Sequence, residues 1–501
     1  MTELPSFPDS TGVGHPASAD PFRAFDPGSF RDPWGRVVVR PDGVYRKLSG
    51  DGLRAWEQLA ASRLCPARPG NEAGGGDRRI VATRLCDSSD GGSLAGGPAG
   101  ESIPDGGLLE HERLPWISYP YEWSFGMLRD AALLQLELLR DALPQGLILR
   151  DGTCYNIQFR GSRPLLIDVL SLAPLVPGEV WDGYRQFCET TLFPLLLSAW
   201  RGINFRTLLR GRLEGVTPGD CRRMLGWRDV FRRGVWTHVI LQDWLNHRTS
   251  ALDASSNPMS GTDLRSIIDG NARGLIRIIE RLRLPPQESH WIDYDAVRPH
   301  YSPEDQGRKD AFVATAMNHR RKRLVWDMGC NTGRFSRIAA ARADCVVAMD
   351  GDPACIERLY RELSTERDEV IVPAVIDLAD PSGGMGWRHR ERAALCDRAR
   401  PDAVLALAVV HHLVFRNAIP VDDVVDWLGS LADELVVEFV GPDDVMVKEL
   451  MRQRRLVHSG YSWGRFRSRL ERTHRIIADQ TLCDGRRTLV HAVRDPSGSR
   501  G

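Results

Sequence analysis

The sequence predicts an α/β protein whose C-terminal half, residues 302–495, forms a doubly wound sheet of seven mostly parallel strands. An α+β part, residues 35–290, is expected to precede it. Three observations support this division. An apolar run leads into a glycine turn and a helix near residue 330, a second apolar run follows it, and three later runs are also strand-like. Alternation of apolar strands with helical segments is typical of a parallel sheet.

The first strand, turn and helix read LVWDMGCNTGRFS over residues 324–336. The apolar residues 324–326 are enough for a buried strand. Gly329 and Gly333 bracket the turn, and helical periodicity starts at Phe335. This order places backbone N–H groups at the carboxyl end of a strand, where open α/β sheets bind nucleotide-like ligands.

The residues inside the turn indicate which ligand it binds. A dinucleotide site reads GxGxxG, but here the middle glycine is replaced, because Cys330, Asn331 and Thr332 separate the two glycines. Asp327 would repel a pyrophosphate and attract a cation such as the ammonium group of S-adenosylmethionine (SAM). Asn331 tolerates left-handed backbone angles, so the turn should survive. Asp350, which ends the second strand, can accept hydrogen bonds from ribose hydroxyls.

The later strands follow in order. A third ends at Asp377 and Leu378, and a fourth, fully apolar, ends at His411 and His412. A fifth covers residues 435–440, and an antiparallel hairpin over residues 473–494 completes the sheet.

Together these segments resemble class I SAM-dependent methyltransferases, in particular the nodulation NoeA-related group. The resemblance implies a Rossmann-like sheet, SAM as cofactor, and a carbohydrate or another small hydroxylated or amino compound as methyl acceptor. It places the acceptor beside His411 and His412, the predicted catalytic residues, because histidine can act as a base near neutral pH. The implied cofactor-binding set is Asp327, Gly329, Cys330, Asn331, Gly333, Asp350, Gly351, Asp377 and Leu378.

Two further residues of this half leave alternatives open. Trp387, in the glycine-rich stretch 382–392, is either a lid over the pocket or a plug in the core. Glu438 interrupts an apolar strand, so it is either buried and paired or close to the site.

The N-terminal half begins with residues 1–34, which are rich in Pro, Ser, Asp and Gly and predict a disordered lead-in. Alternation around an Asp-Gly pair predicts a β-hairpin over residues 36–49, followed by a helix over 52–62. Residues 66–107 are dominated by Gly and Ser and predict a flexible insertion without a site. A boundary between the halves is expected near residues 290–302.

Asp151, Asn156 and Asp168 have the spacing of a kinase catalytic loop followed by a metal-binding carboxylate. This part resembles sugar and aminoglycoside phosphotransferases, which implies Mg-ATP held through Asn156 and Asp168. The pattern departs from that family, because Leu149 replaces the usual histidine and no GxGxxG loop precedes it. The alternative is that the three residues only cap turns. No metal site is expected elsewhere.

Composition limits which classes of protein and of partner remain possible. The chain has 501 residues, 42% of them hydrophobic, and 66 acidic residues balance 66 Lys and Arg. Zero net charge disfavours a nucleic-acid partner, and no apolar stretch is long enough to span a membrane. Ten scattered cysteines without a CxxC pair fit a reduced, cytoplasmic location. Nothing in the sequence indicates an oligomeric state. A methyltransferase is the leading hypothesis, and the alternatives are a kinase-like phosphotransferase and a non-catalytic SAM-binding scaffold.

Overall fold

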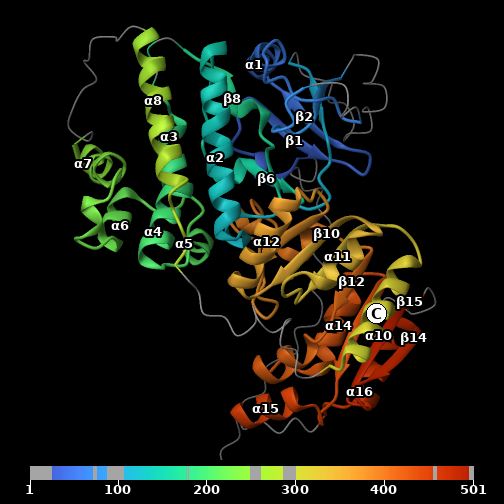
Figure 1. The fold of residues 1–501 in the computed structure, drawn as a ribbon. Coiled ribbons are helices and arrows are strands. Elements are labelled where there is room, and N and C mark those ends of the chain that lie inside the picture. The colour runs from blue at the N-terminus through green and yellow to red at the C-terminus, as the bar shows by residue number, and fades with distance from the viewer. Residues whose placement is uncertain are drawn as a thin grey trace, which may run out of the picture.

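Figure 1 shows the computed structural model of the chain, in which an N-terminal half packs against a C-terminal half. The structure describes residues 25–70, 76–86, 106–176, 178, 180–248, 261–285, 301–454 and 460–495.

The C-terminal half contains a seven-stranded sheet with the strand order β11-β10-β9-β12-β13-β15-β14. All neighbouring pairs are parallel except those of β15, which runs antiparallel to both β13 and β14. The predicted seven-stranded sheet and its terminal hairpin are therefore confirmed. The strands are β9 (Lys322–Met328), β10 (Ala343–Asp350), β11 (Ile371–Val375), β12 (Ala403–Ala406), β13 (Glu434–Val440), β14 (His474–Leu482) and β15 (Arg487–Arg494).

Helices cover both faces of this sheet, as expected for a doubly wound fold. On one face, α10, α11 and α12 pack against Val325 and Val346. On the other, α14 and α16 share a core with Leu324 and Trp326. The helices of this half are α10 (Pro303–Asn318), α11 (Arg334–Ala340), α12 (Pro353–Glu366), α13 (Leu395–Arg398), α14 (Val421–Leu431), α15 (Val445–Arg454) and α16 (Trp463–Leu470).

Two of these helices begin after a residue of a type that favours a helix start. The Ser302 side chain caps α10 by accepting a hydrogen bond from the amide of Asp305. Asp352 caps α12 in the same way, and Pro353 occupies the first helical position. The cap fixes where α12 starts, and therefore fixes the short connection between Asp350 and the helix.

The N-terminal half contains a four-stranded antiparallel sheet with the order β1-β2-β4-β3, two small two-stranded sheets, β5-β8 and β6-β7, and a group of helices. The predicted hairpin is confirmed, because β1 pairs with β2 around Pro41–Gly43. The strands are β1 (Gly35–Val39), β2 (Val44–Leu48), β3 (Thr83–Leu85), β4 (Leu108–His111), β5 (Leu147–Leu149), β6 (Ile157–Arg160), β7 (Arg163–Leu166) and β8 (Leu172–Pro174). The helices are α1 (Gly50–Ala60), α2 (Phe125–Ala142), α3 (Gly183–Phe187), α4 (Phe193–Arg201), α5 (Phe205–Gly211), α6 (Pro218–Met224), α7 (Leu241–Arg248) and α8 (Gly261–Ile279).

Two segments expected to lack order are ordered in part. Of the predicted lead-in, residues 25–34 are described, and the amide of Asp26 donates to the carbonyl of Val37 at 2.7 Å. Within the predicted flexible insertion, β3 pairs with β4, and Ile80 is 2% exposed. Burial of Ile80 and its neighbours supplies the apolar area that the Gly/Ser composition concealed. Residues 1–24, 71–75 and 87–105 lie outside the described residues, as does most of the predicted boundary.

In the described part of the chain, no helix combines the length and apolar character needed to cross a membrane.

Candidate functional site

The glycine turn after β9 is held against the end of β10. The amides of Gly329 and Cys330 both donate to the carbonyl of Met349, at 2.8 and 2.9 Å. Gly329 and Gly333 have φ angles of 82° and 83°, and Asn331 has 53°, so the predicted left-handed asparagine is confirmed. A side chain at position 333 would also meet Leu359 of α12 at 2.6 Å. Glycine is therefore required there for both conformation and space.

Asp350 links the turn to the start of α12. Its Oδ2 accepts a hydrogen bond from the amide of Asn331 at 2.9 Å, and its Oδ1 accepts one from the amide of Asp352 at 2.8 Å. Burial raises the pKa of Asp350, and these two backbone amides oppose the rise. A carboxylate fixed in this way has oxygen lone pairs left for hydroxyl donors, the geometry that ribose recognition needs. Gly351, beside it, is exposed.

Asp327 is 1% exposed at the base of the turn. Its Oδ2 accepts a hydrogen bond from the hydroxyl of Ser336 at 2.6 Å. Burial raises the pKa of Asp327 to about 7, against the lowering effect of Ser336. Among the described residues no ion pair includes Asp327 or Asp350. This end of the sheet therefore carries carboxylates that a cationic ligand would stabilise.

The segment after β11 lies beside Asp350. An added Cβ on Gly351 would lie 3.8 Å from the Cα of Asp377. Asp377 is exposed and accepts a hydrogen bond from the amide of Ala379, so it also caps a turn. Leu378 is half-buried and packs on the core. Trp387 is 64% exposed, so its interpretation as a core plug is wrong.

The two histidines follow β12 after a short loop rather than directly at the strand end. Ala408 in this loop has a φ angle of 55°, which is rare for a residue with a side chain. The side chain of Val409 packs over Gly329 and would lie 3.2 Å from an added Cβ there. The loop therefore joins the histidines to the glycine turn, with the rings of His411 and His412 4.2 Å apart.

Both histidines favour the neutral form. Burial lowers the pKa of His411 well below 6.5, and His412 adds to the effect. Burial also lowers the pKa of His412, to about 4. The expectation that either residue titrates near neutral pH without much tuning is therefore wrong. In the described part of the chain, the buried Nδ1 of His411 has no hydrogen-bond partner.

Glu438 is fully buried and paired. Its Oε2 accepts a hydrogen bond from the Nζ of Lys309 at 2.7 Å, and Oε1 accepts one from the hydroxyl of Tyr301. Arg487 donates to the same hydroxyl and pairs with Asp444 at 2.8 Å. The charges of Lys309 and Arg487 also contribute to the low pKa of His411, so this cluster lies near the histidines.

Sequence reasoning missed Lys309, although a signal was present. Lys309, Val313 and Ala316 share the buried side of α10. A lysine at helical spacing with buried apolar residues indicates a buried partner carboxylate.

The three residues of the kinase-like pattern do come together. The Nδ2 of Asn156 donates to the hydroxyl of Ser171 at 3.0 Å, and that hydroxyl donates to Asp168 at 2.8 Å. Asp151 is close enough for the charge of Asp168 to raise its pKa, after the larger effect of burial. A kinase-like fold for this half stays a prediction.

A cationic side chain of the protein itself pairs with Asp168. The Nη1 of Arg46 lies 2.6 Å from Oδ1 of Asp168, and the two side chains are 8% and 22% exposed. Although burial opposes ionisation, Arg46 and Ser171 hold the pKa of Asp168 below its usual value. In the described ranges no group of three or more His, Cys, Asp or Glu side chains is arranged to hold a metal ion. The geometry therefore gives Mg-ATP no support.

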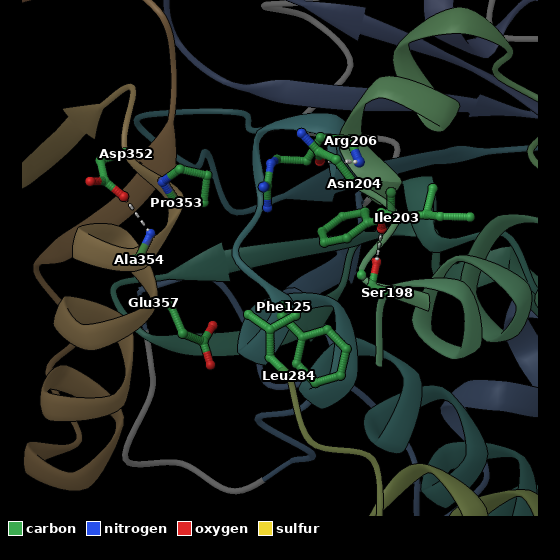
Figure 2. A pocket seen from close by; sticks show the side chains of 12 residues that line it. Phe125, Ser198, Ile203, Asn204, Arg206, Leu284, Asp352, Pro353, Ala354 and Glu357 are labelled. Atoms are coloured by element: carbon green, nitrogen blue, oxygen red, sulfur yellow. Dashed lines mark hydrogen bonds between the residues drawn. The ribbon is translucent and has the colours of Figure 1, made fainter. Parts of the chain in front are cut away.

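A cavity of about 410 Å³ lies between the halves, where α2, α4, α5 and α12 meet (Figure 2). Arg206, Phe125 and Asn204 line it from the N-terminal half, and Asp352 and Glu357 from α12. Burial lowers the pKa of Arg206 to about 10, despite the charge of Glu357. Because Asp352 is two residues from Asp350, residues of both halves adjoin the candidate site.

The sheet has the strand order of the class I methyltransferase fold, in which the second-last strand, here β15, runs antiparallel to its neighbours. The glycine turn and Asp350 also fit this fold. No protein-family model matches the chain. The chain belongs to the family of nodulation protein NoeA. It is 33% identical to "Nodulation protein NoeA" of Rhizobium meliloti (strain 1021) over 483 residues, which cover 92% of this chain and 94% of the relative.

Solved structures that match the chain include the N-methyltransferase NodS from Bradyrhizobium japonicum WM9, at 14% identity and a TM-score of 0.28. That match covers 39% of this chain and 99% of NodS. Another is magnesium protoporphyrin IX methyltransferase (ChlM) from Synechocystis PCC 6803 with bound SAH, at 19% identity and a TM-score of 0.30. It covers 42% of this chain and 90% of ChlM.

Proposed function

We propose that the chain is a SAM-dependent methyltransferase that acts on a small-molecule or carbohydrate-type acceptor. The observation that carries this proposal is the position of Asp350, which is tied by backbone amides to both the glycine turn and the start of α12. Such a carboxylate is placed to accept hydrogen bonds from the two ribose hydroxyls of an adenosine. The carbohydrate-type acceptor is inferred from the resemblance to the nodulation group.

The other residues fit the remaining parts of SAM. The turn from Gly329 to Gly333 would hold the methionine end, with Asp327 favouring its ammonium group. Gly351, Asp377 and Leu378 would flank the adenine. SAM supplies an electrophilic methyl group on a sulfonium. The protein has to align the acceptor with that group and exclude water.

The histidines are assigned to the acceptor. A neutral imidazole can accept a hydrogen bond from a hydroxyl or amine and so hold it in line with the methyl group. Since the pKa of His412 is about 4, its imidazole is neutral throughout the physiological range. Positioning by the histidine therefore contributes more than proton removal by it, because its imidazolium form is disfavoured there. As the methyl group moves to the acceptor, its bond to sulfur breaks, S-adenosylhomocysteine leaves, and the proton of the acceptor passes to water.

The test is methyl transfer from labelled SAM to a small-molecule extract, followed by kinetics with the acceptor that becomes labelled. His412→Ala should lower turnover by about 10²-fold while SAM affinity stays nearly constant. With SAM at saturation, turnover of the wild type should decline only below about pH 5, as His412 becomes protonated. An acid limb of this saturated turnover centred near pH 6.5, or wild-type turnover in the His411→Ala/His412→Ala double variant, would exclude this role.

We propose that the protein acts in the cytoplasm. We also propose that the reaction involves no nucleic acid, membrane or metal.

A further inference from the structure

The connection between β11 and β12, residues 376–402, contains little helix. In a doubly wound sheet this crossover normally carries a helix that covers one face of the sheet. Here it contains only α13, of four residues, and a short turn at Trp387–His389. Something else must cover the apolar side chains that β9, β10 and β11 present on that face, because they are buried.

The N-terminal half supplies this cover. β11 contacts β6 and the turn Pro120–Glu122, and α12 contacts α2 (Figure 1). The ring of Trp116 meets that of Trp326 edge-on, with centroids 5.4 Å apart, and the two residues are 2% and 0% exposed. Trp326 is the residue directly before Asp327. The core of the N-terminal half is therefore continuous with the base of the candidate cofactor site.

One carboxylate connects this cover to the crossover. Glu122, 2% exposed, accepts hydrogen bonds from Nη1 and Nη2 of Arg398 at 2.7 and 2.5 Å. It also accepts one from the hydroxyl of Ser382 at 2.8 Å and one from the amide of Tyr119 at 3.1 Å. Four donors from two halves meet on one buried side chain. The ion pair with Arg398 is bidentate, and such charge-assisted hydrogen bonds are stronger than neutral ones.

Arg398 is enclosed by the N-terminal half. Its guanidinium lies over the rings of Trp116 and Tyr119, 4.6 and 4.7 Å from their centroids. It also donates to the carbonyl of Ile117 at 2.9 Å. Nearer the start of the crossover, Arg210 of α5 forms two hydrogen bonds of 3.0 Å with the carboxylate of Asp380.

The crossover has little structure of its own to hold it. Its internal pairing is an isolated bridge between Met385 and Arg392. Arg388 and His389 both have φ angles of 57°, a conformation that costs free energy for residues with side chains. The contacts with the N-terminal half therefore set where residues 377–398 lie.

We propose that the N-terminal half is a structural part of the cofactor site, in which Glu122 is a positioning residue that fixes segment 377–398 beside Asp350. This inference rests on the proposed function, because Asp377 and Leu378 of that segment are assigned to the adenine. This structural role of the N-terminal half requires no second catalytic activity. SAM affinity should then depend on a side chain that does not touch SAM.

The experiment uses the full-length chain and measures SAM affinity by calorimetry, unfolding by thermal melting, and amide exchange of residues 377–398. The key variant is Glu122→Gln/Arg398→Met, which removes the charged network without leaving one buried charge unpaired. Replacing both partners of a buried ion pair by similar-sized neutral groups is often close to neutral for stability. We expect a melting midpoint near that of wild type, faster exchange in residues 377–398, and about tenfold weaker SAM binding.

The matched control breaks an ion pair between the halves at the opposite end of β11. Glu369 lies 3.3 Å from Arg163 and 3.6 Å from Arg78, just before the strand begins. Glu369→Gln should leave SAM affinity within about twofold of wild type. Equal losses in the control and the double variant would overturn the proposal, as would a folded double variant with wild-type affinity.

If the double variant does not fold, Ser382→Ala decides, because it removes one hydrogen bond to Glu122 and one from Arg398 at 3.1 Å but leaves the ion pair in place. About two- to threefold weaker SAM binding is then expected, and unchanged binding overturns the proposal. Failure of the proposed function has a different signature, since wild type itself would not bind SAM. Exchange of residues 377–398 still tests the contact in that case, and unchanged exchange in the folded variant would overturn it.

Discussion

Each half of the molecule gathers carboxylates that sequence reasoning assigned to a ligand or to catalysis, but among the described residues only the N-terminal half neutralises one of them, Asp168, by an internal ion pair. In the N-terminal half, Asp168 is paired with Arg46 at 2.6 Å, and its pKa lies below the usual value. In the C-terminal half, burial raises the pKa of both Asp327 and Asp350, and neither has an ion-pair partner in the described residues. A cationic ligand therefore has more to gain at the second site than at the first.

The difference shows why spacing alone is a poor guide to chemistry. Asp151, Asn156 and Asp168 come together, yet an arginine from β2 pairs with Asp168. The cation comes from a residue more than one hundred positions earlier in the chain, and no local motif indicates that it folds onto Asp168. A site is defined by the charges around it as much as by the residues in it.

The largest effect is expected from a variant that breaks the ion pair between Asp168 and Arg46. Asp168→Ala leaves Arg46 buried without its closest partner, so it should lower the free energy of unfolding by about 3 kcal/mol. SAM affinity of the folded fraction should stay at the wild-type value. Urea unfolding and calorimetry measure the two quantities separately. A loss of SAM affinity larger than the loss of folded protein would contradict the separation of the two sites.

Next in size is the effect at the ribose position. Asp350→Ala removes the acceptor of the hydrogen bonds from two ribose hydroxyls. SAM should therefore bind about ten- to a hundredfold more weakly, a loss of about 1.5–3 kcal/mol of binding free energy. Calorimetry at one temperature measures this directly. Asp42→Ala, in the exposed turn between β1 and β2, is a suitable surface control and should bind SAM normally. Unchanged SAM binding by Asp350→Ala would remove that residue from the site.

The raised pKa of Asp327 gives a smaller, pH-dependent effect. In the free protein this carboxyl is protonated below about pH 7 and ionised above it. A bound cation stabilises the ionised form, so SAM affinity should rise as pH increases through about 7, by up to about tenfold per pH unit below it. Binding should also release protons.

The variant Asp327→Asn isolates this contribution, because the ligand's own amino group also titrates in that range. The variant should bind SAM more weakly at high pH and show a shallower pH dependence than wild type. Identical pH profiles for the two proteins would mean that Asp327 serves only the packing of the turn.

The sequence was most informative where one local rule decides the structure. Apolar runs located the strands of the C-terminal sheet. The caps at Ser302 and Asp352 are equally local, because a capping side chain acts on its own next turn. The left-handed Asn331 followed from the same kind of local reasoning.

What the sequence could not predict depends on partners distant in the chain. The neutral state of His411 and His412 results from burial, which strand position alone does not reveal. The pairing of Glu122 with Arg398 joins residues 276 positions apart. Order in residues 76–86 depends on pairing with β4, although the surrounding stretch 66–107 is rich in Gly and Ser.

The most direct test of the account is calorimetry of the full-length wild-type protein titrated with SAM and, separately, with ATP and magnesium. Asp327 and Asp350, which have no ion-pair partner among the described residues, predict saturable binding of SAM at one site per chain. The pairing of Arg46 with Asp168 predicts no magnesium-dependent binding of ATP. Absence of SAM binding, or magnesium-dependent ATP binding that Asp168→Asn abolishes, would contradict the assignment of the ligand site to the C-terminal half.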